Sequence, residues 1–237
     1  FYFFPILINF FVFLLFYFFS KYSLEQSFSK FKIRFIYITS SILFLVLYKI
    51  LFISYNDNYF EFFAKDSLQY FNISQSFIAN GILFSTEEYL RLGYDIEDLG
   101  AILSTTFSNL FYISPVSYNI LNIICGYISV MSLYRLSNNF MPQRFSQLTC
   151  ITYMFSSFNF YYYATGMKES IFIMLIILFY ENFYKFLTSK NIVFLLFSIL
   201  FLSSLFLFRP AVLYFIILSF IIGIIFSQKS KLSGIIL

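Results

Sequence analysis

Long runs of apolar residues, separated by short segments that hold most of the charges, constrain this sequence more than any other feature. Hydrophobic residues make up 60% of the chain and charged residues 11%, whereas an ordinary soluble domain has about 25% charged residues. Such a chain cannot cover a folded surface with polar groups, so the lipid bilayer is its expected solvent. The sequence therefore predicts an all-α, polytopic membrane protein.

Seven of the apolar runs approach the roughly 20 residues that a membrane-spanning helix needs. They are 1–20, 35–54, 113–134, 145–164, 169–187, 191–208 and 210–227. The fourth contains Gln147 and Asn159. The last two flank Arg209-Pro210, where we expect a tight turn, because proline suits the first position of a helix. We expect 1–237 to be a single transmembrane domain from the N-terminal part of a longer protein.

The basic residues predict an orientation, because Lys and Arg favour cytoplasmic loops. If the seven spans alternate, most basic residues fall on one side of the membrane: Lys21, Lys30, Lys32, Arg34, Arg135, Arg144, Lys185, Lys190, Lys229 and Lys231. The other side receives only Lys65, Arg91, Lys168 and Arg209. The N-terminus is therefore expected outside and Leu237 inside.

The long segment 55–112 is predicted to be an external loop with surface helices. The possible capping residues Asn56, Asp57 and Asn58 and the stop residue Gly81 bound a helical pattern. Apolar residues recur within it at helical spacing: Phe63, Tyr70, Ile73 and Phe77. We expect an amphipathic helix on the outer membrane surface and a second helix over 95–108. A solvated acidic face is expected from Glu87, Glu88, Asp95, Glu97 and Asp98.

Four ionisable residues are expected at the outer membrane level. Lys168 and Glu169 follow three tyrosines at the start of the fifth span, Asp66 lies in the surface helix, and Arg209 lies at the last turn. Ionisable groups at this depth usually face the bundle interior or a water-filled cavity. A carboxylate can act as a general base for a hydroxyl, and lysine and arginine can hold a phosphate. The set indicates a lipid-linked phosphate substrate.

A simpler interpretation of the same residues stays open. Asp66 would be a solvated side chain, and Glu169 would favour the dipole of its helix. Lys168 would then be an interfacial anchor, and Arg209 part of a plain turn.

Three segments resemble the GT-C class of multi-pass glycosyltransferases. They are "AKDSLQYFNISQSFIANG", "YYYATGMKESIFIMLIILFY" and "FLFRPAVL". The resemblance implies a bacterial inner-membrane (plasma-membrane) enzyme of cell-envelope polysaccharide biosynthesis, with a polyprenyl-phosphate-linked sugar as donor and a glycan or lipid as acceptor. It implies that Asp66 is the catalytic base and that Tyr70, Lys168, Glu169 and Arg209 bind substrate or phosphate. The chain departs from the class in its extra span before the loop and in having Lys65, not a second acid, beside Asp66.

Other function classes remain as alternatives. A polysaccharide polymerase has a similar outline, and a non-catalytic assembly subunit is compatible with the sequence. A lipid-linked oligosaccharide flippase should carry ionisable groups or broken helices near the bilayer midplane, whereas the predicted spans are almost free of charge. The chain has no histidine, and Cys125 and Cys150 lie in apolar segments. No cofactor is therefore expected, and a divalent metal bound by other ligands stays open. Because topology accounts for the positive charges, no nucleic-acid partner is expected; membrane lipid is.

Overall fold

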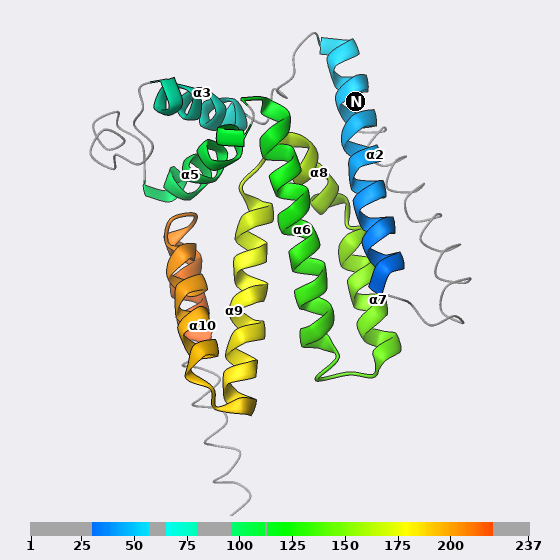
Figure 1. Cartoon of the computed structure of the whole chain (residues 1–237), viewed down its shortest axis with the longest axis vertical. Helices are drawn as coiled ribbons and strands as arrows, with labels where there is room; N and C mark the ends of the chain where they lie inside the picture. Colours follow the sequence, from blue (N-terminus) through cyan, green and yellow to red (C-terminus); the bar gives the residue numbers. More distant parts are fainter. Residues whose placement is uncertain (1–29, 57–64, 80–95, 112, 220–237) are drawn as a thin grey trace, which may run out of the picture.

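The computed structural model describes residues 30–56, 65–79, 96–111 and 113–219. These ranges form nine helices and no strand, as the sequence predicted (Figure 1). The helices are α2 (Lys30–Asn56), α3 (Lys65–Ala79), α5 (Ile96–Phe111), α6 (Pro115–Ser137), α7 (Gln143–Met154), α8 (Ser157–Thr165), α9 (Glu169–Ser189), α10 (Ile192–Leu205) and the helix Pro210–Ser219.

Two described helices are long and apolar enough to cross a membrane, judged by length and composition. They are Val116–Ser137 in α6 and Glu169–Ser189, which is α9. The apolar stretches Ile36–Ile50, Ile192–Leu205 and Pro210–Ser219 are shorter. The structure thus supports membrane character through two helices rather than seven spans. The first predicted span, 1–20, lies outside the described residues, as do the last residues of the seventh.

The predicted span 145–164 is wrong as a single helix. The chain leaves helical geometry at Phe155 and Ser156, where Ser156 is extended (φ −61°, ψ 128°), and it resumes as α8. The side chain of Asn159 donates a hydrogen bond of 2.5 Å to the carbonyl of Tyr153 near the break. At about 1.5 Å per residue, neither α7 nor α8 is as long as the roughly 30 Å hydrocarbon core.

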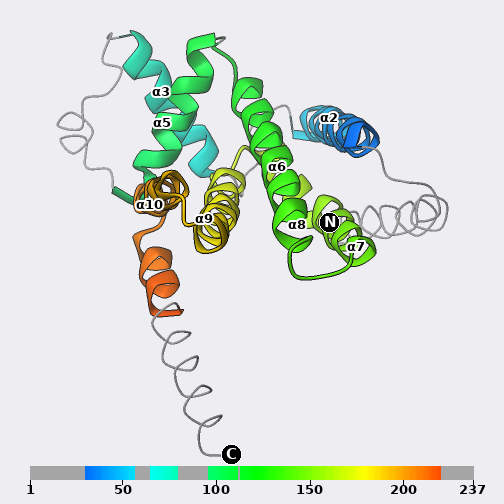
Figure 2. The same ribbon diagram turned by 60° about the horizontal axis from the view of Figure 1, so that its bottom comes forward.

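The turn expected at Arg209-Pro210 is confirmed. Helix α10 ends at Leu205, the next residues form a turn, and Pro210 begins the following helix (Figure 2). Proline lacks an N–H and has a fixed φ, so at a first helical position it leaves no donor unpaired. The arrangement places the half-exposed Arg209 at this turn, beside Glu169 at the start of α9.

Helices α3 and α5 form a separate layer across one end of the bundle (Figure 1). Tyr70, Ile73 and Phe77 of α3 are buried against Ala101 and Ile102 of α5. The apolar stripe of α3 therefore packs on another helix. The position of α3 on the outer membrane surface stays a prediction. Asn56 is the last residue of α2 and does not cap α3, while Phe63 and Gly81 lie outside the described residues.

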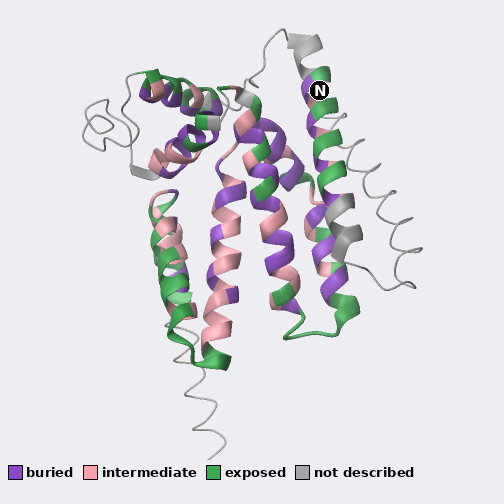
Figure 3. Cartoon of the chain, viewed as in Figure 1, coloured by how far each residue is buried: buried purple, intermediate pink, exposed green. Residues whose placement is uncertain are grey.

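The long helices stand side by side below this layer. Helix α9 packs against both α6 and α10, and α6 also packs against α7, α8 and α2. Apolar side chains on the outer faces of α2 and α10 remain exposed (Figure 3). They include Ile42, Leu43, Leu47, Ile50, Ile192, Leu196, Ile199 and Leu200. A soluble monomer rarely exposes such continuous apolar patches, and lipid chains can cover them.

Candidate functional site

The candidate site lies where the α3–α5 layer meets the start of α9. Helix α8 ends at Thr165 and is capped by Gly166, whose φ of +71° is the left-handed conformation that glycine adopts without strain. The hydroxyl of Ser67 in α3 donates a hydrogen bond of 2.9 Å to the carbonyl of Gly166. This bond joins the α3–α5 layer to the short connection that leads to Lys168, the N-cap residue of α9, and to Glu169, its first residue.

Lys168 forms an ion pair with Asp98 of α5, with 2.7 Å between Nζ and Oδ1. Tyr70 of α3 donates a hydrogen bond of 2.8 Å from its hydroxyl to the same carboxylate oxygen. Three elements therefore meet at one oxygen atom. Asp98 was expected on a solvated acidic face, and this expectation is wrong for it, because its side chain is only 31% exposed and is held by two donors.

Tyr70 keeps its proton as part of this arrangement. Burial raises the pKa of the Tyr70 hydroxyl, and the hydrogen bond to Asp98 and the negative charges of Asp98 and Asp66 raise it further. A phenolate would be unfavourable beside two carboxylates in a buried position. Tyr70 is therefore a permanent hydrogen-bond donor to Asp98 around neutral pH.

Glu169 forms the second ion pair of the site. Its Oε1 lies 3.0 Å from the NH2 nitrogen of Arg209, whose side chain is 51% exposed. The other carboxylate oxygen of Glu169, Oε2, is buried and has no hydrogen-bond partner among the described residues. Lys168 and Glu169 are neighbours in the chain, so the two ion pairs are adjacent. A negative side chain in the first turn of α9 also suits the positive end of the helix dipole.

Helix α5 approaches the turn before Arg209 closely at Gly100. The backbone N–H of Gly100 donates a hydrogen bond of 2.7 Å to the carbonyl of Leu207. A Cβ atom at Gly100 would lie 2.7 Å from the ring of Phe208 and 2.8 Å from that carbonyl oxygen. Only a glycine allows this contact without movement. It fixes the helix that carries Asp98 against the turn that carries Arg209.

Asp66, the predicted catalytic base, is exposed on α3. It precedes Tyr70 by one helical turn, and residues four apart lie on the same face of a helix. Its carboxylate is near enough to the Tyr70 hydroxyl to affect it electrostatically. The structure brings Tyr70, Lys168, Glu169 and Arg209 into two adjacent ion-pair groups, with Asp66 beside them and outside both pairs.

A small cavity lies next to Ser67. Its lining residues are Ser67, Phe71, Thr105, Tyr118, Asn119, Thr165 and Gly166. Its free volume of about 10 Å³ is close to the smallest that can hold one water molecule, so it is no substrate pocket. The Tyr118 hydroxyl is buried without a partner in the described part of the chain. Within the same part, no group of three or more potential metal ligands comes together.

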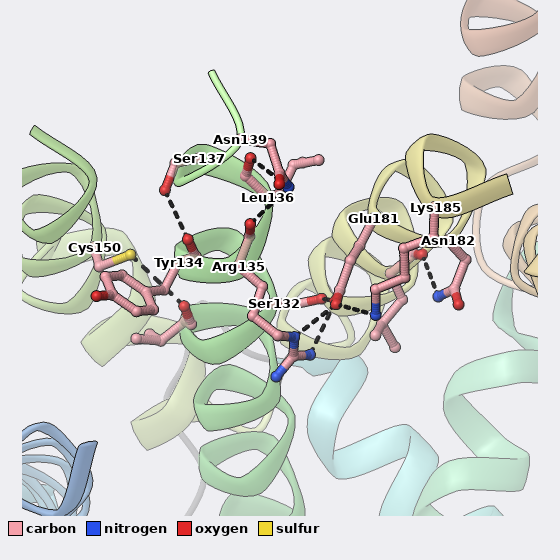
Figure 4. A network of polar contacts seen from close by, with 12 residues as sticks. Ser132, Tyr134, Arg135, Leu136, Ser137, Asn139, Cys150, Glu181, Asn182 and Lys185 are labelled. Carbon is pink, nitrogen blue, oxygen red and sulfur yellow. Dashed lines mark hydrogen bonds and ion pairs between the residues drawn. The ribbon is translucent and has the colours of Figure 1, made fainter. Parts of the chain in front are cut away.

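A second ionic cluster joins the last turn of α6 to the second half of α9 (Figure 4). Glu181 is 2% exposed, and its Oε1 lies 2.6 Å from Nε of Arg135 and 2.7 Å from Nζ of Lys185. Its Oε2 accepts hydrogen bonds from Arg135, at 2.9 Å, and from Ser132. Sequence reasoning missed this group, since it assigned both cations to a loop and treated the spans as almost free of charge. The signal was an acidic residue inside an apolar run.

Comparisons with known proteins give no relative for this chain: no family model, no curated protein and no solved structure matches it. A functional assignment therefore rests on the geometry of the two ionic clusters.

Proposed function

We propose that the chain is a membrane glycosyltransferase that transfers a sugar from a polyprenyl-phosphate donor to a glycan or lipid acceptor at the outer membrane face. The observation that carries the proposal is the pair of adjacent ion pairs, Lys168–Asp98 and Glu169–Arg209, at the end of the helix bundle. Each cation is held in place by a carboxylate, so both are oriented before a substrate arrives. Such fixed charges stabilise a developing charge without reorganisation.

Arg209 is the residue best placed to bind the donor phosphate. Its only ion pair among the described residues uses one guanidinium nitrogen, and half of its side chain is exposed. A guanidinium has further N–H donors in a planar fork that matches phosphate oxygens. Lys168 is more buried than Arg209 and is paired with Asp98. It would therefore attract the phosphate through its positive charge.

The proposed reaction needs one base and one leaving group. Asp66 accepts the proton of the acceptor hydroxyl as its oxygen attacks the anomeric carbon of the donor sugar. The bond between that carbon and the phosphate oxygen breaks, and the polyprenyl phosphate leaves with the electron pair. Arg209 and Lys168 stabilise the phosphate charge. Glu169, Asp98 and Tyr70 hold those two cations in position and take no part in proton transfer.

An assay of the full chain with a radiolabelled polyprenyl-phosphate sugar and a membrane glycan extract tests the proposal. Arg209→Gln should lower transfer at least tenfold, since removing one charge-stabilising donor commonly costs about a hundredfold or more. Arg144→Gln removes an equal charge at the exposed start of α7 and should leave transfer unchanged. Equal rates for the two variants would rule out a phosphate-binding role for Arg209.

A flippase is a second candidate, and one observation favours it. Glu181 is a buried carboxylate within a helix long enough to cross a membrane, and such residues often mark transport pathways. The same assay separates the two functions. A transferase produces free polyprenyl phosphate and a glycosylated acceptor, whereas a flippase moves the intact lipid-linked sugar and leaves its glycosidic bond unbroken.

A further inference from the structure

The Glu181 cluster carries more positive than negative charge. One carboxylate contacts two cations, Arg135 and Lys185, so the three groups sum to one positive charge. The carboxylate is buried, but the side chains of Arg135 and Lys185 are 48% and 40% exposed. Among the described residues, Glu181 is the only acidic partner of either cation. Both cations therefore keep N–H donors that face outward.

Glu181 fixes the positions of the two cations relative to each other. Both contact the same oxygen, Oε1, at 2.6 and 2.7 Å, and Arg135 also reaches Oε2. The shared carboxylate offsets the repulsion between the cations and orders two long, otherwise flexible side chains. Because the two side chains are already ordered, a bound anion loses less free energy to their ordering, and its affinity is higher.

The two exposed cations of the cluster lie near the ends of the two long apolar helices. Arg135 is in the last turn of α6, and Lys185 lies about one turn before the end of α9. These two helices are the ones long and apolar enough to span a membrane. The phosphates of a bilayer lie just outside its hydrocarbon core, so cations near the ends of both helices meet the phosphate level.

Exposed apolar and aromatic side chains lie at the same end of the bundle as the cluster. Phe140, 65% exposed, packs on the ring of Tyr184 with 4.8 Å between ring centroids. Tyr184 is the chain neighbour of Lys185, and Leu187 and Phe145 at the same end are also exposed. Aromatic rings at this level are typical of the membrane interface. A free phosphate ion makes no use of such a surface, whereas the acyl chains of a lipid do.

We propose that Arg135 and Lys185, positioned by Glu181, bind the phosphate headgroup of an anionic membrane lipid. The site lies at the end of the bundle opposite to the proposed catalytic site and does not depend on the proposed function. Nε and Nη2 of Arg135 hold the two oxygens of Glu181. The remaining N–H groups on the outer edge of its guanidinium pair with the phosphate oxygens, and Lys185 contributes a point charge.

Titration of the full chain in neutral detergent with phosphatidylglycerol, followed by native mass spectrometry, tests the site. The chain should bind phosphatidylglycerol at least about tenfold more tightly than phosphatidylcholine. Lys185→Gln, which keeps the Arg135–Glu181 pair and hence the fold, should weaken phosphatidylglycerol binding about tenfold, the usual effect of one charge-assisted hydrogen bond. Arg135→Lys, which keeps the charge but loses the planar fork, should weaken it as well.

Matched controls separate this site from general surface attraction. Arg144→Gln removes one exposed positive charge at the same end of the bundle and should change the affinity less than about twofold, because exposed charges are screened. An equal loss in Arg144→Gln and Lys185→Gln would overturn the proposal. Equal binding of phosphatidylcholine would overturn it too. Complete displacement of the lipid by an equal concentration of inorganic phosphate would assign the cations to a soluble anion instead.

Discussion

Lys168 and Asp98 lie 70 positions apart in the sequence, and their side chains meet at 2.7 Å. The contact joins the N-cap residue of α9, a helix long enough to span a membrane, to α5 in the layer across the end of the bundle. Tyr70 of α3 contacts the same oxygen of Asp98. This single carboxylate therefore links the α3–α5 layer to the start of α9, and it orients one of the two cations of the proposed site.

Breaking this contact should destabilise the fold. Lys168→Met leaves Asp98 half-buried with only Tyr70 as donor, and Asp98→Asn removes the charge that pairs with Lys168. We expect each change to lower the free energy of unfolding by roughly 1–3 kcal/mol. The double variant should lose at least about 0.5 kcal/mol less than the sum of both. Thermal unfolding of the wild type, the two single variants and the double variant in detergent completes this double-mutant cycle. If the losses of the two single variants simply add in the double variant, Lys168 and Asp98 have no coupling energy.

Gly100→Ala should separate α5 from the turn before Arg209. The added methyl would lie 2.7 Å from the ring of Phe208 and 2.8 Å from the carbonyl oxygen of Leu207. Overpacking of this kind costs about 1–3 kcal/mol. Ser104→Ala, one turn later in the same helix, adds no bulk and is the matched control. A Gly100→Ala variant as stable as that control would show that the close contact is not required.

The buried Glu181 predicts an unequal response to two kinds of substitution. Glu181→Gln leaves Arg135 and Lys185 half-exposed, where water can solvate them, so we expect a loss of about 1 kcal/mol. Replacing both cations by glutamine leaves a carboxylate buried without a charged partner, which should cost about 3–5 kcal/mol. Chemical denaturation of the two variants compares them. A larger loss of free energy of unfolding for Glu181→Gln than for the double cation variant would contradict this account, in which the unpaired buried carboxylate is the most destabilising group.

The two clusters should face opposite sides of the membrane. Gln75 is exposed on α3, and Asn139 is exposed in the connection between α6 and α7 at the other end (Figure 1). Cys125 and Cys150 are both buried, so the native thiols give little background labelling. A membrane-impermeant maleimide applied to intact cells should label Gln75→Cys and spare Asn139→Cys until lysis. The reverse pattern would place the proposed site inside the cell.

Local sequence patterns predicted the helices better than their contacts. Runs of apolar residues located α2, α6 and α9, and Arg209-Pro210 located the last turn, because each of these signals is contained in a few neighbouring residues. The break between α7 and α8 was missed although Gln147 and Asn159 interrupted the run. Counting apolar residues does not show that Asn159 can satisfy the carbonyl of Tyr153 across a bend.

The candidate site could be predicted only in part, since ion pairs depend on long-range packing. The end of the bundle at which Lys168, Glu169 and Arg209 lie followed from span alternation, and the structure places all three together. Their partners did not follow. Asp98 resembled its acidic neighbours in sequence, and only the packing of α3 on α5 turns it toward Lys168. The apolar stripe of α3 was correctly detected, but periodicity cannot distinguish burial against a helix from burial in lipid.

The most direct test of the proposed enzyme is the rate of sugar transfer by Asp66→Asn in the purified full chain. Asp66 is the one residue assigned to proton transfer, and the exposed side chain of Gln69 in the same helix provides the control, as Gln69→Ala. General base catalysis contributes about a hundredfold or more, so Asp66→Asn should retain at most about 1% of the wild-type rate while Gln69→Ala stays near it. Helix content and thermal stability should match in all three proteins. A wild-type rate in Asp66→Asn would contradict the assignment of Asp66 as the catalytic base.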